Sequence, residues 1–283
     1  MSIERIAVIG AGTMGRGIVE TAAVHAVDVH VAEIDPEQRR MAETQIETSI
    51  AKAIQRGRLD LPEPDEALQR IHWTTEIATA TADADFVIEA VPEWEELKTG
   101  LFKQLDALTK PEIILASNTS SISITRLAAA TKRPEKVVGM HFFQPVPIMQ
   151  PVEIVRGVRT SDETIVQTRQ LTEQMGKQAF TVSDTPGFAV NRVLMPLVNE
   201  AVFALQEGVA DAETIDSLMK LGCNHPMGPL ELADFIGLDV CLSILQVLHR
   251  ELGDPKFRPC PLLVRMVNAG QLGRKSSEGF YHY

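Results

Sequence analysis

A glycine-rich turn near the N-terminus constrains the fold of this chain more than any other feature. The segment GAGTMG at 10–15 follows an apolar run and precedes a helical pattern. Gly10 permits a tight turn, Gly12 lets a pyrophosphate approach the backbone, and Gly15 lets the helix pack close to a sheet. Free N–H groups at the start of that helix suit phosphates. The cofactor contacts expected from this turn are Gly10, Gly12, Thr13, Met14 and Gly15.

An acidic residue completes the pattern of a dinucleotide site. Glu33 ends an alternating segment at 27–33, and it lies 18 residues after Gly15 (33 − 15). An acid at this point accepts hydrogen bonds from an adenosine ribose 2′-OH and repels a 2′-phosphate. The sequence therefore favours NAD as the cofactor. Arg39 and Arg40 follow soon after and leave NADP as the less favoured alternative.

Strand-like and helical patterns alternate over the first two thirds of the chain and then give way to helices. Such alternation predicts an α/β fold with a Rossmann-type, doubly wound and mostly parallel sheet, followed by an all-α domain. The expected boundary lies between domains 1–184 and 185–283. Strands are expected at 5–9, 27–33, 85–91, 112–117, 137–141, 152–156 and 179–182, and helices at 13–26, 36–57, 95–109, 187–207, 211–221, 228–250 and 259–269.

The composition narrows the class of protein. A net charge of −11 argues against nucleic acid as a partner, although local basic patches can still bind an anionic ligand. No apolar run approaches the length of a membrane span, and no secretory signal is recognised at the N-terminus. Three cysteines without metal-like spacing are expected to be reduced structural thiols, so no metal is predicted. We expect a cytoplasmic protein.

Four polar residues are candidates for chemistry, although each also has an ordinary structural explanation. His141 closes an apolar run, and a lone histidine there more often packs or hydrogen-bonds than catalyses. Ser120 lies among residues that commonly cap helices, and Ser121 or Ser123 could cap the following helix. Glu153 could be a solvated strand residue. Asn191 could bond the backbone where a helix begins.

Long motifs in the right order nevertheless give these residues a shared context. The segments are SNTSS at 117–121, GMHFFQPVP at 139–147, TPGFAVNR at 185–192 and MGPLELADFIGLD at 227–239. With GAGTMG at the start and EGFY at 278–281, nearly the whole chain resembles the L-3-hydroxyacyl-CoA dehydrogenases, and within them the bacterial 3-hydroxybutyryl-CoA dehydrogenases.

The resemblance implies roles in the interconversion of an L-3-hydroxyacyl-CoA and a 3-ketoacyl-CoA. His141 would be the general base, and the acid in reverse, because imidazole exchanges protons near neutral pH. Glu153 would orient the ring, as the acid of a catalytic triad does. Ser120 would hydrogen-bond the 3-oxygen of the substrate. Asn191 would bind substrate or help close the site from the second domain.

The resemblance also implies contacts outside this group. Glu93, Lys98 and Asn118 match positions near NAD. Ser49, Lys52 and Arg56 match positions that hold coenzyme A, and the two cations suit its phosphates, although an ordinary solvated helix face would look the same. The helical domain would form a homodimer.

Departures from the family pattern leave the catalytic set intact. Gln144 replaces a usual Asn, Glu33 a usual Asp, and Ser277 a common Gly, while Pro151 could shift the Glu153 carboxylate. A sugar-acid dehydrogenase of the L-gulonate type and a non-catalytic NAD-binding relative are the alternatives. The basic residues Lys52 and Arg56 argue against the first alternative, and the complete polar set argues against the second.

Overall fold

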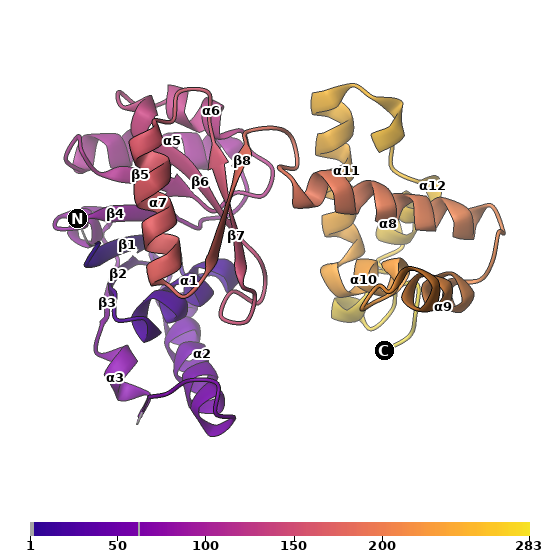
Figure 1. Cartoon of the computed structure of the whole chain (residues 1–283), viewed down its shortest axis with the longest axis horizontal. Coiled ribbons are helices and arrows are strands. Elements are labelled where there is room, and N and C mark those ends of the chain that lie inside the picture. Colours follow the sequence, from indigo (N-terminus) through magenta and orange to yellow (C-terminus); the bar gives the residue numbers. More distant parts are fainter. Residues whose placement is uncertain (1–2, 62) are drawn as a thin grey trace. The chain divides into compact units, whose positions relative to one another are not determined.

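The chain divides into two compact units, Met1–Thr185 and Pro186–Tyr283. The computed structural model describes residues 3–61 and 63–283, which belong to these two units (Figure 1). The sequence had placed the boundary one residue earlier, between 184 and 185. The division therefore falls at the SDTPG segment, where the strand pattern stops.

The described residues of the first unit form an eight-stranded sheet with the order β3-β2-β1-β4-β5-β6-β7-β8. Strands β1 to β6 run parallel, β7 is antiparallel to β6, and β8 is parallel to β7. The mostly parallel sheet predicted from the sequence is thus confirmed. The strands are β1 (Arg5–Ile9), β2 (Asp28–Ala32), β3 (Ile71–Thr74), β4 (Phe86–Glu89), β5 (Ile114–Ser117), β6 (Val137–Phe142), β7 (Pro151–Arg156) and β8 (Gln178–Ser183).

Helices cover both faces of this sheet, as expected of a doubly wound fold (Figure 1). One core joins α1, α2 and α7 to alternate apolar side chains of the strands, and α4 and α6 contact the sheet as well. Central strands are buried on both sides, which explains their continuous apolar runs. The helices of this unit are α1 (Thr13–Val24), α2 (Pro36–Gln55), α3 (Asp65–Leu68), α4 (Ile77–Thr81), α5 (Glu95–Leu108), α6 (Ile124–Ala129) and α7 (Asp162–Gln174).

Local capping explains where two of these helices begin. The Asp35 side chain accepts a hydrogen bond from the Glu37 N–H, and Pro36 occupies the first helical position of α2. Ser123 caps α6 by accepting from the Arg126 N–H at 3.3 Å. Of the two serines considered as caps of this helix, Ser123 therefore has that role.

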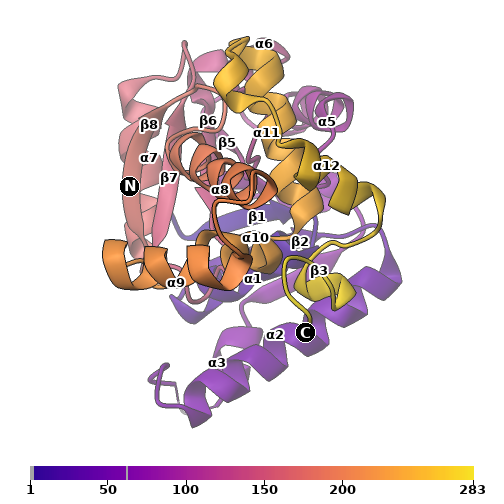
Figure 2. The ribbon, with the colours of Figure 1, turned by 90° about the vertical axis from the view of Figure 1, so that its right-hand side faces the viewer.

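The second unit is helical, and α8 lies against each of its other main helices (Figure 2). The helices are α8 (Val190–Gln206), α9 (Ala212–Cys223), α10 (Pro229–Ile236), α11 (Leu238–Leu252) and α12 (Pro261–Asn268). A continuous helix over 228–250 was wrong. Gly237, at φ +104°, separates α10 from α11, and the two axes meet at 98°. Such a φ angle is outside the helical region and is accessible mainly to glycine.

Four further elements were absent from the sequence interpretation, namely strand β3 and helices α3, α4 and α7. Strand β3 is short, partly buried and at the edge of the sheet, so its apolar pattern is weak. Helix α7 begins at a Ser161 cap that accepts from the Thr164 N–H, and it buries Thr164, Thr168 and Thr172 beside its apolar residues. Among the described residues, no single helix is long and apolar enough to cross a membrane, and only the bent pair α10–α11 passes that test jointly.

Candidate active site

The glycine-rich turn forms a close-packed cradle between β1 and α1. Gly10 has φ +96°, and a Cβ atom there would lie 2.9 Å from the Ala90 carbonyl oxygen at the end of β4. A Cβ atom on Gly15 would lie 2.0 Å from the Gly10 carbonyl oxygen. At Gly12 the same atom would meet no heavy atom within 4 Å, so this side of the turn is open. A tight turn with one open side fits the approach of a dinucleotide pyrophosphate.

Glu33 lies directly after β2 and is held against this turn. One carboxylate oxygen accepts from the Ala11 N–H at 2.8 Å, and the other accepts from the Asp35 N–H at 3.0 Å. The side chain is buried, so the acid has a fixed position. A carboxylate can accept more than two hydrogen bonds, so these contacts leave capacity for a ribose hydroxyl. The contact of Glu33 with ribose stays a prediction.

His141 and Glu153 form a buried pair because β7 runs antiparallel to β6. The two residues are direct register partners, and the His141 Nδ1 atom lies 2.7 Å from a Glu153 carboxylate oxygen. A carboxylate only accepts, so Nδ1 carries the proton and Nε2 is the ring atom that can exchange one. Pro151 is the first residue of β7 and does not disturb this pairing. His141 also packs against Phe143, with ring centroids 4.8 Å apart.

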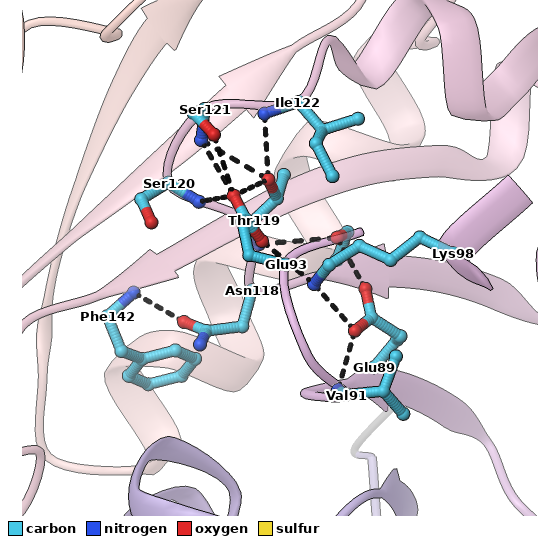
Figure 3. A network of polar contacts seen from close by, with 11 residues as sticks. Glu89, Val91, Glu93, Lys98, Asn118, Thr119, Ser120, Ser121, Ile122 and Phe142 are labelled. Atoms are coloured by element: carbon cyan, nitrogen blue, oxygen red, sulfur yellow. Dashed lines mark hydrogen bonds and ion pairs between the residues drawn. The ribbon is translucent and has the colours of Figure 1, made fainter. Parts of the chain in front are cut away.

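The loop after β5 carries Ser120 and is organised by Glu93 (Figure 3). One oxygen of Glu93 accepts from the Thr119 hydroxyl at 2.5 Å, from the Ser120 N–H at 2.9 Å and from the Ser121 N–H at 3.0 Å. Its other oxygen lies 3.2 Å from the Lys98 Nζ. Burial alone would raise the pKa of Glu93, but the Lys98 ammonium and the loop hydrogen bonds outweigh it and lower that pKa. The backbone that carries Ser120 is thus tied to an anion.

Asn118 connects this loop to the strand that carries the histidine. Its side-chain oxygen accepts from the Phe142 N–H at 3.0 Å, one residue after His141 (Figure 3). Because β4, β5 and β6 are parallel, their carboxyl ends lie along one edge of the sheet. Ser120, Asn118 and His141 therefore come to the same edge, where open α/β sheets bind their ligands.

Two residues at this edge were not singled out from the sequence. Glu89 ends β4 and Ser117 ends β5, and the Ser117 hydroxyl donates to Glu89 at 2.6 Å. Glu89 also accepts from the Lys98 Nζ at 2.7 Å, with both side chains buried. An acid at the end of a wholly apolar strand was the available signal, since a buried carboxylate requires partners.

The expected coenzyme A residues lie on α2. Ser49 is half-buried and donates to the buried Glu20 of α1 at 2.7 Å. Lys52 and Arg56 are exposed near the end of the same helix. Positions 49, 52 and 56 follow helical spacing, so the three side chains share one face. This face combines a hydroxyl with two cations that suit phosphate groups.

Asn191 belongs to the second unit, where it is the second residue of α8. Its expected role beside the first unit stays a prediction. Within the described residues, no group of three or more His, Cys, Asp or Glu side chains is arranged to hold a metal ion.

A glycine cradle and a proton-exchanging histidine at one sheet edge define a dinucleotide-dependent oxidoreductase class. Comparisons with known proteins resolve this class further. Residues 5–185 match the model of the 3-hydroxyacyl-CoA dehydrogenase NAD-binding domain, and residues 187–283 match that of the 3-hydroxyacyl-CoA dehydrogenase C-terminal domain. The chain belongs to the 3-hydroxyacyl-CoA dehydrogenase family.

Relatives match this chain over essentially its full length. A probable 3-hydroxybutyryl-CoA dehydrogenase of Deinococcus radiodurans is 53% identical over 99% of this chain and 100% of its own. The 3-hydroxybutyryl-CoA dehydrogenase of Bradyrhizobium diazoefficiens is 50% identical over 99% of this chain and 96% of its own. The crystal structure of (S)-3-hydroxybutyryl-CoA dehydrogenase from Ralstonia eutropha superposes with a TM-score of 0.96 at 46% identity, covering 100% of this chain and 99% of that one.

Proposed function

We propose that this chain interconverts a short-chain L-3-hydroxyacyl-CoA, such as 3-hydroxybutyryl-CoA, and the corresponding 3-ketoacyl-CoA. The hydrogen bond between His141 and Glu153 carries the proposal. With Nδ1 held by the carboxylate at 2.7 Å, Nε2 takes the hydroxyl proton during oxidation and returns it during reduction. Glu153 also stabilises the imidazolium that forms when the ring accepts this proton.

Ser120 and Asn191 complete the proposed binding of the reacting group. The Ser120 hydroxyl donates to the 3-oxygen of the substrate and stabilises negative charge that develops there. Asn191 contributes an amide from the second unit. Bound NAD supplies the hydride acceptor, and Gly10, Gly12 and Glu33 are the residues proposed to hold it. We propose NAD over NADP because Glu33 would repel a 2′-phosphate.

The acyl-CoA is proposed to reach α2 through its nucleotide end. Lys52 and Arg56 are exposed and lie on the same helical face as Ser49. Their charges would attract the phosphates of coenzyme A, although the protein as a whole carries −11. A small sugar acid has no use for such a face. The helix therefore favours an acyl-CoA substrate over an L-gulonate-type substrate.

Initial rates with several substrates test the activity. Acetoacetyl-CoA and longer 3-ketoacyl-CoAs would be tried with NADH and with NADPH. L-gulonate would be tried with NAD and with NADP. We expect the highest kcat/KM with acetoacetyl-CoA and NADH. Oxidation of L-gulonate without reduction of any 3-ketoacyl-CoA would overturn the proposal, and preference for NADPH would overturn the role of Glu33.

The His141→Ala variant tests the assigned base. Loss of a positioned acid–base group costs roughly 10²- to 10⁴-fold in rate, so kcat should fall by that amount. NADH affinity, measured by fluorescence titration, should stay within a few-fold of the wild type because the glycine turn is untouched. Near-normal turnover by this variant would remove His141 from the mechanism.

We also propose a cytoplasmic homodimer that associates through the second unit. Apolar side chains on α8 and α9 remain solvent-exposed, among them Val193 at 72%, Leu218 at 63% and Leu221 at 87%. We propose that these side chains belong to the association surface, because large contiguous exposed apolar patches mark such surfaces. The described cysteines are free thiols, which suits a reducing compartment. A sedimentation mass near twice 31.1 kDa would support the dimer, and a monomeric mass at micromolar concentration would contradict it.

A further inference from the structure

We propose that Glu89 is a positioning residue for the active-site loop, acting on Asn118 and Ser120 through Ser117 and Lys98. The proposal rests on the proposed function, because it assigns the loop a role in that reaction. Glu89 is fully buried at the carboxyl end of β4, beside the cradle of the glycine turn. Nothing in the packing of an apolar strand requires an acid at this position.

Three polar groups contact the Glu89 carboxylate, and one of them, the Ser117 hydroxyl, lies where the active-site loop begins. One oxygen accepts from the Lys98 Nζ and from the Val91 N–H, each at 2.7 Å. The other accepts from the Ser117 hydroxyl at 2.6 Å. Burial raises the pKa of Glu89, while the Lys98 ammonium and these hydrogen bonds oppose the rise. The carboxylate is therefore costly to bury and is retained by a dedicated set of donors.

The register of the sheet places these contacts at the start of the loop. Glu89 and Ser117 are paired residues of neighbouring parallel strands, and the Asn118 N–H donates to the Glu89 carbonyl at 2.9 Å. The Ser117 hydroxyl in turn accepts from the Thr119 N–H at 3.2 Å. The side chain and backbone of Glu89, with the Ser117 hydroxyl, thus fix three successive residues from the last residue of β5 to Thr119.

Lys98 carries the effect of Glu89 to the tip of the loop. Its Nζ atom bridges Glu89 and Glu93, and Glu93 holds the Ser120 and Ser121 N–H groups (Figure 3). Lys98 is fully buried and its charge is engaged by these two acids, so we assign it a positioning role near the cofactor. Without Glu89, the ammonium would have Glu93 as its remaining acid and would draw it away from the loop.

The same set of contacts reaches the strand that carries His141. Asn118 accepts from the Phe142 N–H, and His141 is paired with Glu153 on β7. Side-chain hydrogen bonds therefore link the carboxyl ends of β4, β5 and β6 to β7. Rigid support of this kind matters because a displacement of about 1 Å in a reacting group costs on the order of 100-fold in rate.

The Glu89→Gln variant tests the proposal. An amide keeps the shape, but its NH₂ group cannot accept from Ser117, and its neutral oxygen holds Lys98 less strongly. We expect kcat for acetoacetyl-CoA reduction to fall roughly 10- to 100-fold, as loss of supporting contacts around a site commonly does. The KM for acetoacetyl-CoA should change less than kcat, because α2 is untouched. Ser117→Ala removes a single hydroxyl and should shift kcat in the same direction by less.

Asp106→Asn provides the matched control. It perturbs another buried ion pair of α5, with Arg133, and in the described part of the chain the hydrogen bonds of this pair stay outside the 117–122 loop. Hydrogen–deuterium exchange adds a readout that is independent of activity. Glu89→Gln should speed exchange of the Ser120 and Ser121 amides by about tenfold or more, whereas Asp106→Asn should leave these amides unchanged.

Two results together would overturn the positioning role. Hydrogen–deuterium exchange in the loop of Glu89→Gln would be unchanged, and the kcat of Glu89→Gln would lie within twofold of that of Asp106→Asn. An inactive wild-type enzyme would instead refute the proposed function, and the exchange data alone would then decide whether Glu89 orders the loop. If Glu89→Gln fails to fold, the exchange and kcat of Ser117→Ala give the same decision.

Discussion

The two ends of helix α5 each hold a buried ion pair, and the two pairs serve different purposes. Near its start, Lys98 contacts Glu89 and Glu93. Near its end, Asp106 contacts Arg133 at 2.8 Å. Eight residues separate Lys98 from Asp106 (106 − 98), which is about 12 Å along a helix axis. Each end holds a buried cation against a buried acid, Lys98 with Glu89 and Arg133 with Asp106, and the two ends differ mainly in the other groups that they hold.

Arg133 donates to backbone carbonyls where α5 ends. Its guanidinium contacts the carbonyl oxygens of Asp106, Thr109 and Lys110, which include acceptors left over at a helix C-terminus. These bonds stabilise a helix end and the following turn. The acids beside Lys98 instead hold hydroxyl and N–H groups of the loop that carries Ser120. A buried ion pair therefore supports function only where its remaining donors or acceptors form hydrogen bonds with the backbone of an active-site loop.

The largest expected effect comes from Lys98→Met. Removing the cation leaves two acids near each other without their shared partner, and breaking a buried pair costs about 3–5 kcal/mol. We expect the free energy of unfolding to drop by about that amount at pH 8, and kcat to fall at least as far as in Glu89→Gln. The stability deficit should shrink at pH 5, because an unpaired buried carboxyl takes up a proton more readily. Urea denaturation at pH 8 and pH 5 measures the difference in the free energy of unfolding between Lys98→Met and the wild type.

Arg133→Met is the matched control at the other end of α5. It removes a buried cation of comparable exposure and should also cost about 3–5 kcal/mol. Its kcat at 25 °C should stay within a few-fold of the wild type, because the loop contacts remain. Equal losses of kcat in both variants, at equal losses of stability, would erase the proposed difference between the two ends of the helix.

The sequence predicted the parts of this molecule that local patterns encode. The turn at 10–15 and the alternation of strands and helices both depend on residues that are close in sequence. The Glu153 carboxylate was placed against His141 by family resemblance. The structure adds the cause, which is the reversed direction of β7 relative to β6.

Features that depend on long-range contacts were beyond the sequence. Glu89 and Ser117 were passed over because neither shows its partner in the sequence, and only the pairing of β4 with β5 brings them together. Glu93 and Lys98 were expected near the cofactor, yet their shared contact with Glu89 emerges only from the fold. The break at Gly237 was missed because apolar residues continue on both sides of it.

A smaller effect is expected at Glu20, a buried acid that lacks the cation contact present at both ends of α5. Among the described residues, no Lys, Arg or His nitrogen lies within the 4.0 Å ion-pair distance of its carboxylate. Burial raises the pKa of Glu20 to about 7, against weaker opposition from Ser49, Arg16 and Lys177. Glu20 thus shows what burial does to an acid that neither Lys98 nor Arg133 compensates.

The pH dependence of stability should reveal this cost. Below pH 4.5 the Glu20 carboxyl is protonated in both folded and unfolded chains, and its favourable contribution is fully present. As pH rises from 4.5 to about 7 the unfolded chain releases the proton first, so stability is lost by up to about 3 kcal/mol. Glu20→Gln keeps the acceptor for Ser49 and carries no charge. The variant should therefore match the wild type near pH 4.5 and exceed its stability above pH 7.

Urea denaturation between pH 4.5 and 8 would measure the difference, with Glu47→Gln on the exposed face of α2 correcting for the change in net charge. A Glu20→Gln variant that is less stable than the wild type at pH 8 would mean that Arg16 and Lys177 compensate the buried charge at longer range. Direct contact with a cation would then no longer distinguish the ion pairs of α5 from an isolated buried acid. Only the hydrogen bonds to the loop would set the acids beside Lys98 apart from Glu20.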